Sequence, residues 1–520
     1  MREEEVPVLV VGAGLAGLST ALFLGLHEVG ATVVDRHPST SNQPKARGQM
    51  PAIMEAFRAA GLADEIVAAM PPGRPEMTIV ICESVVGRVF TSFSEALEDY
   101  PALSPAPVGM ASQQRAEAAL ARRAAELGAD LRFSTRLESL TQDEDCVHAV
   151  LTDLRTGERY GLRSRYLVAA DGHRGSIAAH AGITTRSRAA FGHSTTTSFT
   201  ADIADRLPDS AVLMYYVQNP ALPEGAGAFV STDRPGEYVA AFPADPDRTD
   251  QQTRELIREM LGLDVEITTE ASNTWEVAHR VADRLSAGRV FLAGDAAHLM
   301  PPTGGQGGNT AMLDGLHLAW KLAAVIKGQA GPGLLAGHND EHLPYGTAVA
   351  DWQFANMIER QRPDLVVEDP PAPVDSLALM FGYRRPSGAF VVESGSDGEL
   401  FEDPRKPSGR PGTRAPHVAL RRGADEVSTR ELCFRGFVLL SEDEGWIAAA
   451  RQVATERGLR LDAHHIGAEL IDPDGTWTQT YGVSRSGAVL IRPDGVIGWR
   501  TSAAPERSAL DTAFTTILDR

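Results

Sequence analysis

The sequence predicts an α/β fold in which one parallel-sheet domain is split along the chain. A glycine triplet at Gly12, Gly14 and Gly17 stands between an apolar run and a helix-like stretch. A second glycine-rich motif opens at Gly294 and Asp295, far along the chain. Short apolar segments punctuated by proline, glycine and aspartate lie between the two motifs, which predicts an antiparallel sheet inserted into the split domain.

The first motif has the order of elements that a phosphate-binding turn requires. Val8–Val11 is an unbroken aliphatic run, typical of a strand buried on both faces of a parallel sheet. Residues 16–26 then predict a helix whose N-terminus faces phosphates, because side chains at the three glycines would block the tight turn. Asp35 ends the next predicted strand, where a carboxylate can accept hydrogen bonds from ribose hydroxyls. The motif therefore indicates FAD or NAD rather than a cofactor with a 2′-phosphate.

The order of strand-like segments and of proline- and glycine-rich passages predicts the domain organisation. Four strand-like segments predict the inserted sheet: Thr195–Ala201, Val212–Val217, Gly227–Ser231 and Tyr238–Phe242. Pro-rich passages predict linkers. The later sequence Pro493-Asp494-Gly495 is typical of the turn in a β-hairpin. The predicted parts are a split domain at 1–180 and 280–360, with part of 75–105 joining the inserted substrate sheet at 181–279, a linker and crossing segment at 361–412, and a small α/β domain at 413–520.

Composition narrows the classes of function. The chain has 520 residues, 43% of them hydrophobic, so it can bury more than one core. Its formal net charge of −20 argues against nonspecific nucleic-acid binding. Cys82, Cys146 and Cys433 are too scattered for a disulfide framework, and no C-x-x-C or Cys/His spacing suggests zinc, so no metal is predicted. The acidic flank Glu3–Glu5 argues against a signal peptide or membrane anchor, and we expect a cytoplasmic protein.

The second motif carries a resemblance to a known family. It reads Gly294-Asp295-Ala296-Ala297-His298 and continues as Pro301-Pro302-Thr303-Gly304-Gly305-Gln306-Gly307-Gly308-Asn309. Together with the glycine triplet, Asp171-Gly172 and Arg384, it resembles the FAD-dependent aromatic hydroxylases, the group A flavoprotein monooxygenases with the para-hydroxybenzoate hydroxylase fold. The resemblance is strongest to the aromatic polyketide hydroxylases of antibiotic pathways. It implies a split Rossmann-like FAD-binding domain, an inserted substrate sheet and a C-terminal thioredoxin-like domain.

The resemblance also implies a set of cofactor contacts. Asp295 would bind a ribityl hydroxyl of FAD, and the loop from Pro302 to Asn309 would pass the isoalloxazine edge, with Pro302 and Gly304 near the ring. The helix that starts near Asn309 would direct its positive end at the reduced flavin. The expected cofactor-binding residues are Gly12, Gly14, Leu15, Ala16, Gly17, Asp35, Arg36, Lys45, Arg47, Gln113, Asp171, Gly172, Gly294, Asp295, Pro302, Gly305, Gly307, Gly308 and Asn309.

The chain departs from the family pattern at several of these places. Lys45 stands where an arginine that touches the flavin is usual, and lysine lacks the planar, bidentate contacts of arginine. Ala52 replaces a second arginine, while Gly175 and Ala178 replace a serine and an arginine. Nicotinamide docking and flavin mobility could therefore differ from the family pattern. The cations that could compensate are Arg47, Arg115 and Arg174.

The chemistry that the resemblance implies uses FAD, O2 and either NADPH or NADH. The nicotinamide reduces FAD, dioxygen adds at C4a, and the hydroperoxide passes one oxygen to a phenolic carbon. The expected activity is hydroxylation of a polycyclic aromatic polyketide by a monomer or homodimer, and the catalytic base is unassigned. Candidate substrate contacts are Tyr215, Tyr216 and Arg384; adjacent strand residues face opposite sides, so at most one tyrosine reaches the pocket. His298 is expected to make a structural hydrogen bond.

Two other classes of function stay open. The same flavin could support Baeyer–Villiger insertion, an oxidative rearrangement or the inactivation of an antibiotic, which product mass and ring connectivity would separate. A FAD-binding protein that shields an intermediate, or a scaffold that binds a partner through the C-terminal domain, would show no substrate-stimulated NAD(P)H consumption. Cys433 has no partner at C-x-x-C spacing, so disulfide exchange is not expected.

Overall fold

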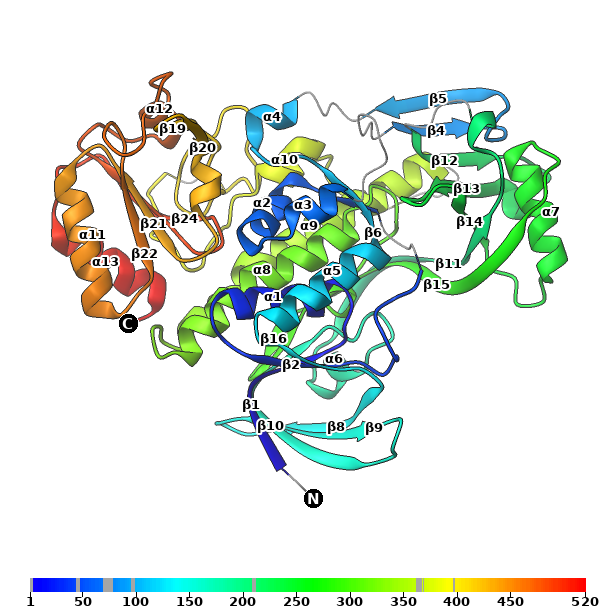
Figure 1. Cartoon of the computed structure of the whole chain (residues 1–520), viewed down its shortest axis with the longest axis horizontal. Coiled ribbons are helices and arrows are strands. Elements are labelled where there is room, and N and C mark those ends of the chain that lie inside the picture. The colour runs from blue at the N-terminus through cyan, green and yellow to red at the C-terminus, as the bar shows by residue number, and fades with distance from the viewer. Residues whose placement is uncertain are drawn as a thin grey trace.

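The computed structural model describes residues 3–43, 47–68, 78–94, 99–207, 212–361, 367, 369–395 and 398–520. Figure 1 shows a central α/β domain, a sheet domain on the right and a smaller α/β domain on the left. The strands of the central sheet are β1 (Glu3–Val11), β2 (Ala31–Val34), β7 (Asp130–Arg132), β8 (Thr135–Gln142), β9 (Val147–Asp153), β10 (Arg159–Ala169), β16 (Ser286–Ala287) and β17 (Val290–Leu292). They follow the path β16-β17-β10-β1-β2-β7, and the β8–β9 hairpin pairs with β10 through β9.

The middle of this sheet is parallel and buried. β1 pairs in parallel with β2 and β10, and β10 pairs in parallel with β17. Val8, Leu9 and Val10 have no exposed surface, as the unbroken aliphatic run predicts. Three helices pack together beside the sheet: α1 (Leu15–Leu26), α5 (Gln113–Glu126) and α8 (Gly307–Ile326). α1 and α8 approach so closely that a Cβ on Gly315 would lie 2.6 Å from the amide nitrogen of Thr20.

The second sheet lies beside the central domain and has eight strands in the order β18-β15-β11-β14-β13-β12-β4-β5. Its strands are β4 (Thr78–Cys82), β5 (Val89–Ser94), β11 (Thr185–Thr200), β12 (Val212–Gln218), β13 (Ala226–Ser231), β14 (Glu237–Pro243), β15 (Thr268–Ala282) and β18 (His298–Leu299). The four predicted strands are present. The described pairs are antiparallel, except that β12 runs parallel to β4, which the sequence analysis did not predict.

One face of the second sheet is covered by α7 (Asp250–Leu261), a helix that the sequence analysis did not identify. Thr249 caps it through a capping box with Gln252, and Gly262 ends it in a left-handed conformation. Ile257, Met260 and Leu261 bury the apolar side of α7 in the core of this sheet. The opposite face of the sheet is therefore the one available to the central domain.

Shorter elements and one long helix connect these two bodies. The short elements are β3 (Arg47–Gln49), α2 (Pro51–Ala60), α3 (Ala63–Ala68), α4 (Tyr100–Leu103), β6 (Gly109–Ser112), α6 (Ile177–His180) and α10 (Ser376–Phe381). The long helix is α9 (Gly333–Gln361), which runs from the central domain toward the second sheet (Figure 1). Asp351 of α9 binds Arg188 of β11 at 2.6 Å and His279 of β15 at 2.8 Å. The helix is thus tied to two strands of the sheet.

The C-terminal domain has a four-stranded sheet in the order β22-β21-β23-β24. Its elements are β19 (Ala419–Arg422), β20 (Asp425–Ser428), β21 (Phe437–Ser441), α11 (Glu444–Arg457), β22 (Leu461–His465), α12 (Trp477–Tyr481), β23 (Ala488–Ile491), β24 (Ile497–Thr501) and α13 (Arg507–Leu518). The Pro493-Asp494-Gly495 turn joins the antiparallel strands β23 and β24, as predicted. Burial raises the pKa of the Cys433 thiol to about 11, so the side chain is a packed thiol rather than a nucleophile.

A buried charge network, formed by Lys321, Glu341, Arg492 and Asp494, joins the C-terminal domain to α8 and α9. Arg492 donates to both carboxylate oxygens of Glu341, at 3.0 and 2.8 Å, and to Asp494 Oδ1 at 3.0 Å. The Nζ atom of Lys321 lies 2.9 Å from Glu341 Oε1, and all four side chains are completely buried. Burial alone would raise the pKa of Glu341, but Arg492 and Lys321 bring it well below its usual range. A second buried carboxylate, Glu55 of α2, binds Arg414 and Arg430.

Three stacked histidines beside this network predict a stability that falls in acid. The centroid of the His342 ring lies 4.6 Å from that of His317 and 4.6 Å from that of His338, and burial lowers the pKa of each of the three. The folded state therefore keeps them neutral, while the unfolded chain binds protons below about pH 6.5. Each histidine should remove ~1.4 kcal/mol of stability for each pH unit between 6.5 and its lower folded pKa. The free energy of unfolding, measured by urea denaturation at several pH values, should depend less steeply on pH in His342→Phe than in the wild type. The exposed control His180→Phe should keep the wild-type dependence, and an unchanged pH dependence in His342→Phe would contradict the assignment.

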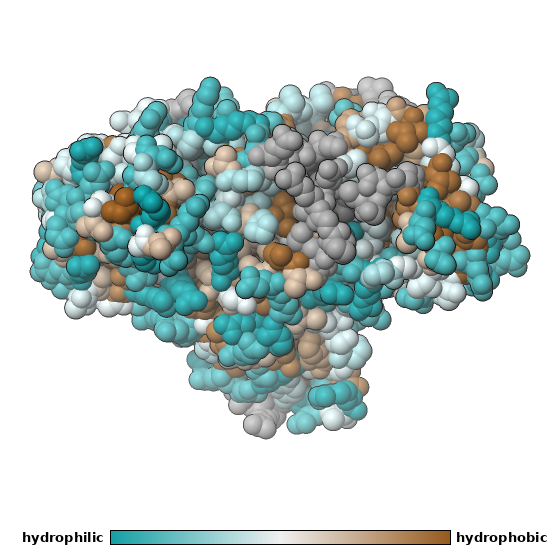
Figure 2. All heavy atoms as spheres, turned by 45° about the horizontal axis from the view of Figure 1, so that its top comes forward, coloured by the Kyte–Doolittle hydropathy of each residue, from teal (hydrophilic) through white to brown (hydrophobic). Residues whose placement is uncertain are grey.

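Much of the molecular surface is hydrophilic. Figure 2 shows a face covered largely by hydrophilic side chains, with apolar groups scattered among them. Among the large hydrophobic side chains that are exposed, Val89, Phe90 and Phe93 all belong to β5, at the edge of the second sheet. Within the described ranges, no helix has both the length and the hydropathy that crossing a membrane requires.

Candidate active site

The glycine triplet forms a tight turn between β1 and α1. A Cβ on Gly12, which has φ 108°, would overlap the carbonyl oxygen of Ala170, and a Cβ on Gly17 would overlap the carbonyl oxygen of Gly12. Gly14 is different, because a Cβ there would meet no atom nearer than the Glu117 carboxylate at 3.8 Å. The fold itself therefore needs glycine at positions 12 and 17. At position 14 the backbone faces open space, which suits the close approach of a phosphate.

The N-terminus of α1 is prepared for an anion. Gly14 is its N-cap, no side chain caps its first turn, and that turn contains no acidic residue. Asp35 follows β2 at the same edge, where its Oδ2 accepts a hydrogen bond from the Ala13 amide at 2.7 Å. Its Oδ1 accepts a hydrogen bond from the His37 amide at 2.8 Å. The carboxylate is thus fixed beside the glycine turn, with Arg36 as its neighbour in the chain.

Asp171 and Gly172 follow β10 at this edge as well. The Oδ2 atom of Asp171 accepts a hydrogen bond from the Ile177 amide at 3.2 Å, whereas Oδ1 is buried with no hydrogen-bond partner in the described structure. Burial raises the pKa of the Asp171 carboxyl. A Cβ on Gly175 would overlap this carboxylate, so the local backbone requires glycine at this position. The unpartnered oxygen is an acceptor that a bound group can satisfy.

The second motif begins in direct contact with the first. Gly294 has φ 63°, and a Cβ on it would lie 2.9 Å from Cβ of Ala16 in α1. The Oδ2 atom of Asp314 in α8 accepts a hydrogen bond from the Gly294 amide at 2.8 Å and lies 2.7 Å from Nε2 of His298. Burial opposes charge on His298, but Asp314 raises its pKa above the ordinary value. The structural hydrogen bond expected of His298 is therefore made, and Asp295 is left exposed.

A single side chain from α9 clamps the loop that follows. Gln353 accepts a hydrogen bond from the Gln306 amide through Oε1 and donates to the Pro301 carbonyl through Nε2, both at 2.7 Å. Its backbone carbonyl accepts a hydrogen bond from the Thr303 hydroxyl, also at 2.7 Å. The two ends of the loop are thus held against one face of α9. Because α9 is also bound to β11 and β15, the loop is fixed relative to the second sheet.

Glycines shape the open side of this loop. Gly304 packs against the Trp352 ring so closely that a Cβ would overlap it, whereas a Cβ on Gly305 would meet no atom within 4 Å. Gly307 begins α8, whose first turn contains no acidic residue and whose N-cap residue, Gln306, makes no side-chain cap. The positive end of α8, whose first turn has no side-chain cap, favours a bound group with negative charge.

Two predicted cofactor contacts have side chains that bind the protein instead. Asn309 accepts a hydrogen bond from the Met50 amide at 2.8 Å and donates to the Gly48 carbonyl at 3.2 Å. Arg47 of β3 donates to the Ser231 carbonyl of β13 at 2.7 Å. These bonds link the loop, β3 and the second sheet in series. Their role toward a cofactor stays a prediction.

Gln113 begins α5 and donates to Glu117 Oε1 at 2.7 Å. The other oxygen of Glu117 accepts a hydrogen bond from the Ser41 amide at 2.9 Å, and only 2% of Glu117 is exposed. This carboxylate lies nearest to the open side of Gly14, yet the sequence analysis did not identify it. The sequence does indicate one of its contacts, because Gln113 and Glu117 are four residues apart in a helix and therefore lie side by side. Lys45 lies outside the described residues.

The two predicted substrate tyrosines face opposite sides of the second sheet, as the strand alternation requires. Tyr215 lies in the core beneath α7, with its ring 5.8 Å from that of Phe229. Tyr216 is buried on the other face, and burial raises the pKa of its hydroxyl to about 12. Arg384 lies in the crossing segment, where its amide donates to the Leu400 carbonyl at 2.8 Å.

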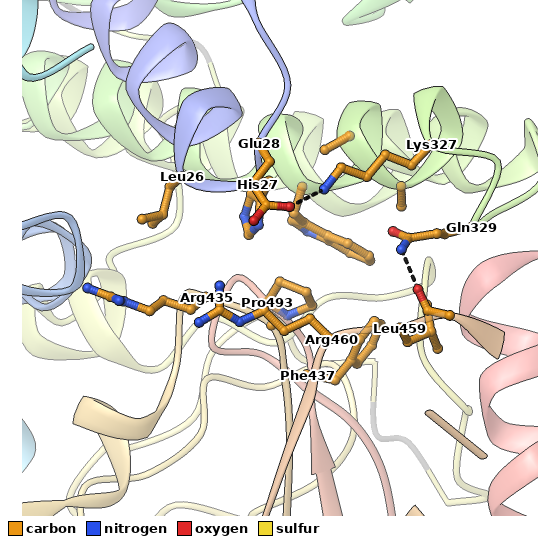
Figure 3. Close-up of a pocket in the computed structure, with 15 residues that line it drawn as sticks. Leu26, His27, Glu28, Lys327, Gln329, Arg435, Phe437, Leu459, Arg460 and Pro493 are labelled. Atoms are coloured by element: carbon orange, nitrogen blue, oxygen red, sulfur yellow. Dashed lines mark hydrogen bonds and ion pairs between the residues drawn. The ribbon is translucent and has the colours of Figure 1, made fainter. Parts of the chain in front are cut away.

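A cavity of about 310 Å³ lies elsewhere, between the central and C-terminal domains. Figure 3 shows it lined by the ends of α1 and α8 and by residues next to β21 and β22. Lys327 binds Glu28 across its upper side at 3.1 Å, and Gln329 donates to the Gly458 carbonyl at 2.6 Å. α8 has 20 residues, so its two ends are ~30 Å apart. This cavity is therefore remote from the glycine loop.

The fold and the site define a dinucleotide-binding protein with a split domain and an inserted sheet. Residues 5–353 match the family described as FAD binding domain, and residues 408–520 match the aromatic-ring hydroxylase C-terminal family. The chain belongs to the FAD-dependent aromatic-ring hydroxylases. It is a flavin-dependent monooxygenase that uses FAD, O2 and a reduced nicotinamide. The fold class and the family expected from the sequence are confirmed.

Relatives match the chain over its full length. The aklavinone 12-hydroxylase RdmE of Streptomyces purpurascens is 39% identical, and the match covers 100% of both chains. A 4-methyl-5-nitrocatechol 5-monooxygenase of a Burkholderia species is 37% identical, covering 99% of this chain and 98% of the relative. The structure of aklavinone-11 hydroxylase in a ternary complex with FAD and aklavinone superposes with a TM-score of 0.93 at 38% identity, covering 100% of both chains.

Proposed function

We propose that this monooxygenase hydroxylates a polycyclic aromatic polyketide in an antibiotic pathway. The observation that carries the proposal is the position of the loop from Pro301 to Asn309. The motif that leads into the loop starts at Gly294 against Ala16 of α1, and the loop is clamped by α9 and tied through β3 to the second sheet. A group held there would lie between a nucleotide-binding turn and a sheet face. The aklavinone hydroxylases among the relatives support the polyketide as the substrate class.

The residues at this edge of the central sheet fit FAD. The free space above Gly14 and the uncapped N-terminus of α1 suit its pyrophosphate, and the Asp35 carboxylate suits a ribose. The unpartnered oxygen of Asp171 and the exposed carboxylate of Asp295 offer acceptors for further hydroxyl or amide donors. When bound, FAD supplies the redox chemistry with NAD(P)H and O2.

The protein contributes binding, orientation and electrostatics rather than a reacting side chain. The Gln353 clamp holds the loop in one conformation, so the open backbone at Gly305 is presented without rearrangement. The N-terminus of α8 favours negative charge on a group placed there. We propose that the sheet face that carries the buried Tyr216 helps to exclude water from the aromatic substrate. We also propose a cytoplasmic monomer or homodimer.

Asp295→Ala should weaken FAD binding without unfolding the protein. The side chain is exposed, so its loss opens no cavity in the core, while a carboxylate hydrogen bond to FAD is worth about 1.5–3 kcal/mol, or ~10- to 150-fold in affinity. Flavin fluorescence titration of the apoprotein measures the change. Asp264→Ala removes another exposed carboxylate, away from the site, and should bind FAD normally. Equal affinity in the two variants would contradict the role of Asp295.

The substrate class is tested with the purified holoenzyme and a panel of phenols. The panel contains anthraquinone-type and angucycline-type polycyclic phenols and, as a single-ring comparison, 4-methyl-5-nitrocatechol, with NADPH and NADH each in turn. Polycyclic phenols should stimulate NAD(P)H oxidation and gain one oxygen with the ring system intact. Stimulation by the nitrocatechol alone would replace the polyketide by a single-ring substrate. A ring-opened or ring-expanded product would indicate Baeyer–Villiger chemistry, and no stimulation would favour a non-oxygenating FAD protein.

A further inference from the structure

A cluster of metal-ligating side chains lies on the turn between β8 and β9, at the lower end of Figure 1. It consists of Asp143, Cys146 and His148, and one ligand atom from each lies within 4.8 Å of the other two. Asp143 is exposed, Cys146 is buried and His148 is partly buried. The β8–β9 hairpin is remote from the glycine turn and from the second sheet, so the proposed function makes no use of this cluster.

The separations of the three ligand atoms are close to those of a tetrahedral zinc site. Typical zinc bonds of about 2.3 Å to sulfur, 2.05 Å to nitrogen and 2.1 Å to oxygen place tetrahedral ligands ~3.6 Å (S to N), ~3.4 Å (N to O) and ~3.6 Å (S to O) apart. The structure has 3.3 Å from Cys146 Sγ to His148 Nε2, 2.8 Å from that Nε2 to Asp143 Oδ2, and 3.7 Å from Sγ to the same Oδ2. The nitrogen-to-oxygen separation, now a hydrogen bond, needs to widen by ~0.6 Å, and the sulfur-to-nitrogen separation by ~0.3 Å. We propose that Asp143, Cys146 and His148 form a site for Zn²⁺ or a similar thiophilic divalent cation.

The carboxylate is already oriented for this role. Oδ1 of Asp143 accepts hydrogen bonds from the amides of Asp145 and Cys146, both at 2.8 Å, which fixes the side chain across the turn. Oδ2 is left to face His148. Such support of a ligating carboxylate by outer hydrogen bonds is usual in metal sites.

The surrounding charges are compatible with a bound cation. Arg163 donates from Nε to Cys146 Sγ at 3.0 Å, a bond that a metal-bound thiolate can also accept, and its other end binds Glu5. The sequence places two further acids, Glu144 and Asp145, beside the cluster. A dication held by one thiolate and one carboxylate is neutral as a unit, so Arg163 remains balanced by these neighbouring acids.

The ligand types select the class of metal. Thiolate and imidazole favour Zn²⁺ and other late divalent metals, whereas Ca²⁺ and Mg²⁺ prefer all-oxygen sites. Because Asp143 is at the surface, water can complete the fourth position. The spacing D-x-x-C-x-H is shorter than the paired spacings of common zinc modules, which is why the sequence analysis predicted no metal.

Binding converts the Cys146 thiol to a zinc-bound thiolate, forming the Zn–S bond and releasing the thiol proton to solvent. The Zn–N bond needs the lone pair of His148 Nε2, so the hydrogen that Nε2 now shares with Asp143 moves to Nδ1 as the neutral ring changes tautomer. The test uses the FAD-loaded, chelator-treated full chain, with Zn²⁺ uptake measured by calorimetry and by elemental analysis after gel filtration. The wild type should bind one Zn²⁺ at this site with release of about one proton. Cys146→Ser and His148→Ala should each weaken this binding more than about tenfold, and the proton release should vanish in Cys146→Ser.

Control experiments distinguish a specific zinc site from nonspecific binding of cations to acidic side chains. Asp145→Asn removes a neighbouring acid that is not a ligand and should keep Zn²⁺ affinity, and millimolar Mg²⁺ should not compete. Flavin absorbance and the thermal midpoint of each metal-free variant show whether it is folded. If Cys146→Ser folds poorly, the Zn²⁺ affinities of Asp143→Asn and His148→Ala are compared with that of the wild type instead. Zinc X-ray absorption should show one sulfur at about 2.3 Å. Absent uptake by the wild type, or uptake by Cys146→Ser and His148→Ala equal to that of the wild type, would overturn the proposal.

Discussion

Replacing Gly14 by alanine is expected to remove most of the bound FAD while the apoprotein keeps its fold. A Cβ at this position meets no protein atom nearer than 3.8 Å, so the folded chain can accept it. The same Cβ would occupy the space through which a pyrophosphate approaches the backbone. We expect FAD affinity to fall at least tenfold, or ~1.4 kcal/mol, with an unchanged thermal midpoint of the apoprotein. Flavin fluorescence titration and circular dichroism measure the two quantities.

Two other glycines provide the controls for this experiment. Gly17→Ala should destabilise the protein, because its Cβ would overlap the Gly12 carbonyl oxygen and neither backbone can move cheaply. Gly30→Ala should change neither property, since the nearest atom to its Cβ is 3.9 Å away and the residue lies before β2. Normal FAD affinity in Gly14→Ala would show that the pyrophosphate does not approach this turn.

Glu341→Ala should cause the largest loss of stability among single substitutions in α9. Glu341 has no exposed surface and is bound by Arg492 and Lys321, so its removal leaves two buried cations without their shared carboxylate. Breaking a buried ion pair in this way costs about 3–5 kcal/mol. Urea unfolding of the holoenzyme, followed by tryptophan fluorescence, measures the loss.

The matched control is Glu359→Ala, which removes an exposed carboxylate from the same helix. It should change the free energy of unfolding by less than about 0.5 kcal/mol. Because Arg492 belongs to the C-terminal domain and Glu341 to α9, Glu341→Ala should also loosen the attachment of that domain, seen as faster proteolysis in the 361–412 segment. A loss below about 1 kcal/mol would mean that the network is not what holds the two domains together.

Local patterns explain why so many elements could be predicted from the sequence. The run Val8–Val11, the glycine triplet and Asp35 lie within one βαβ unit, and each reports a constraint set by near neighbours. The same holds for Pro493-Asp494-Gly495, which forms the predicted turn. The parallel pairing of β12 with β4 was missed, because it joins strands far apart in sequence and no local pattern records a partner.

In the candidate site too, features set by near neighbours in the sequence were predicted, and features set by distant residues were not. Residue type and motif predicted which segments converge, but side-chain direction depends on distant partners. Asn309 and Arg47 bind Met50 and Ser231 rather than facing open space, and nothing near them in the sequence indicates this. Gln353 clamps the loop with three hydrogen bonds, yet as a single glutamine in a long helix it has no recognisable motif.

The most direct test of the assigned chemistry is the source of the oxygen in the product. Purified holoenzyme is supplied with NAD(P)H, an anthraquinone-type phenol and oxygen-18-labelled dioxygen, and the product is analysed by mass spectrometry. A monooxygenase of this family should place one labelled atom in the product and none when only the water is labelled. Label from water, or NAD(P)H oxidation without any oxygenated product across the panel, would contradict aromatic hydroxylation by this protein.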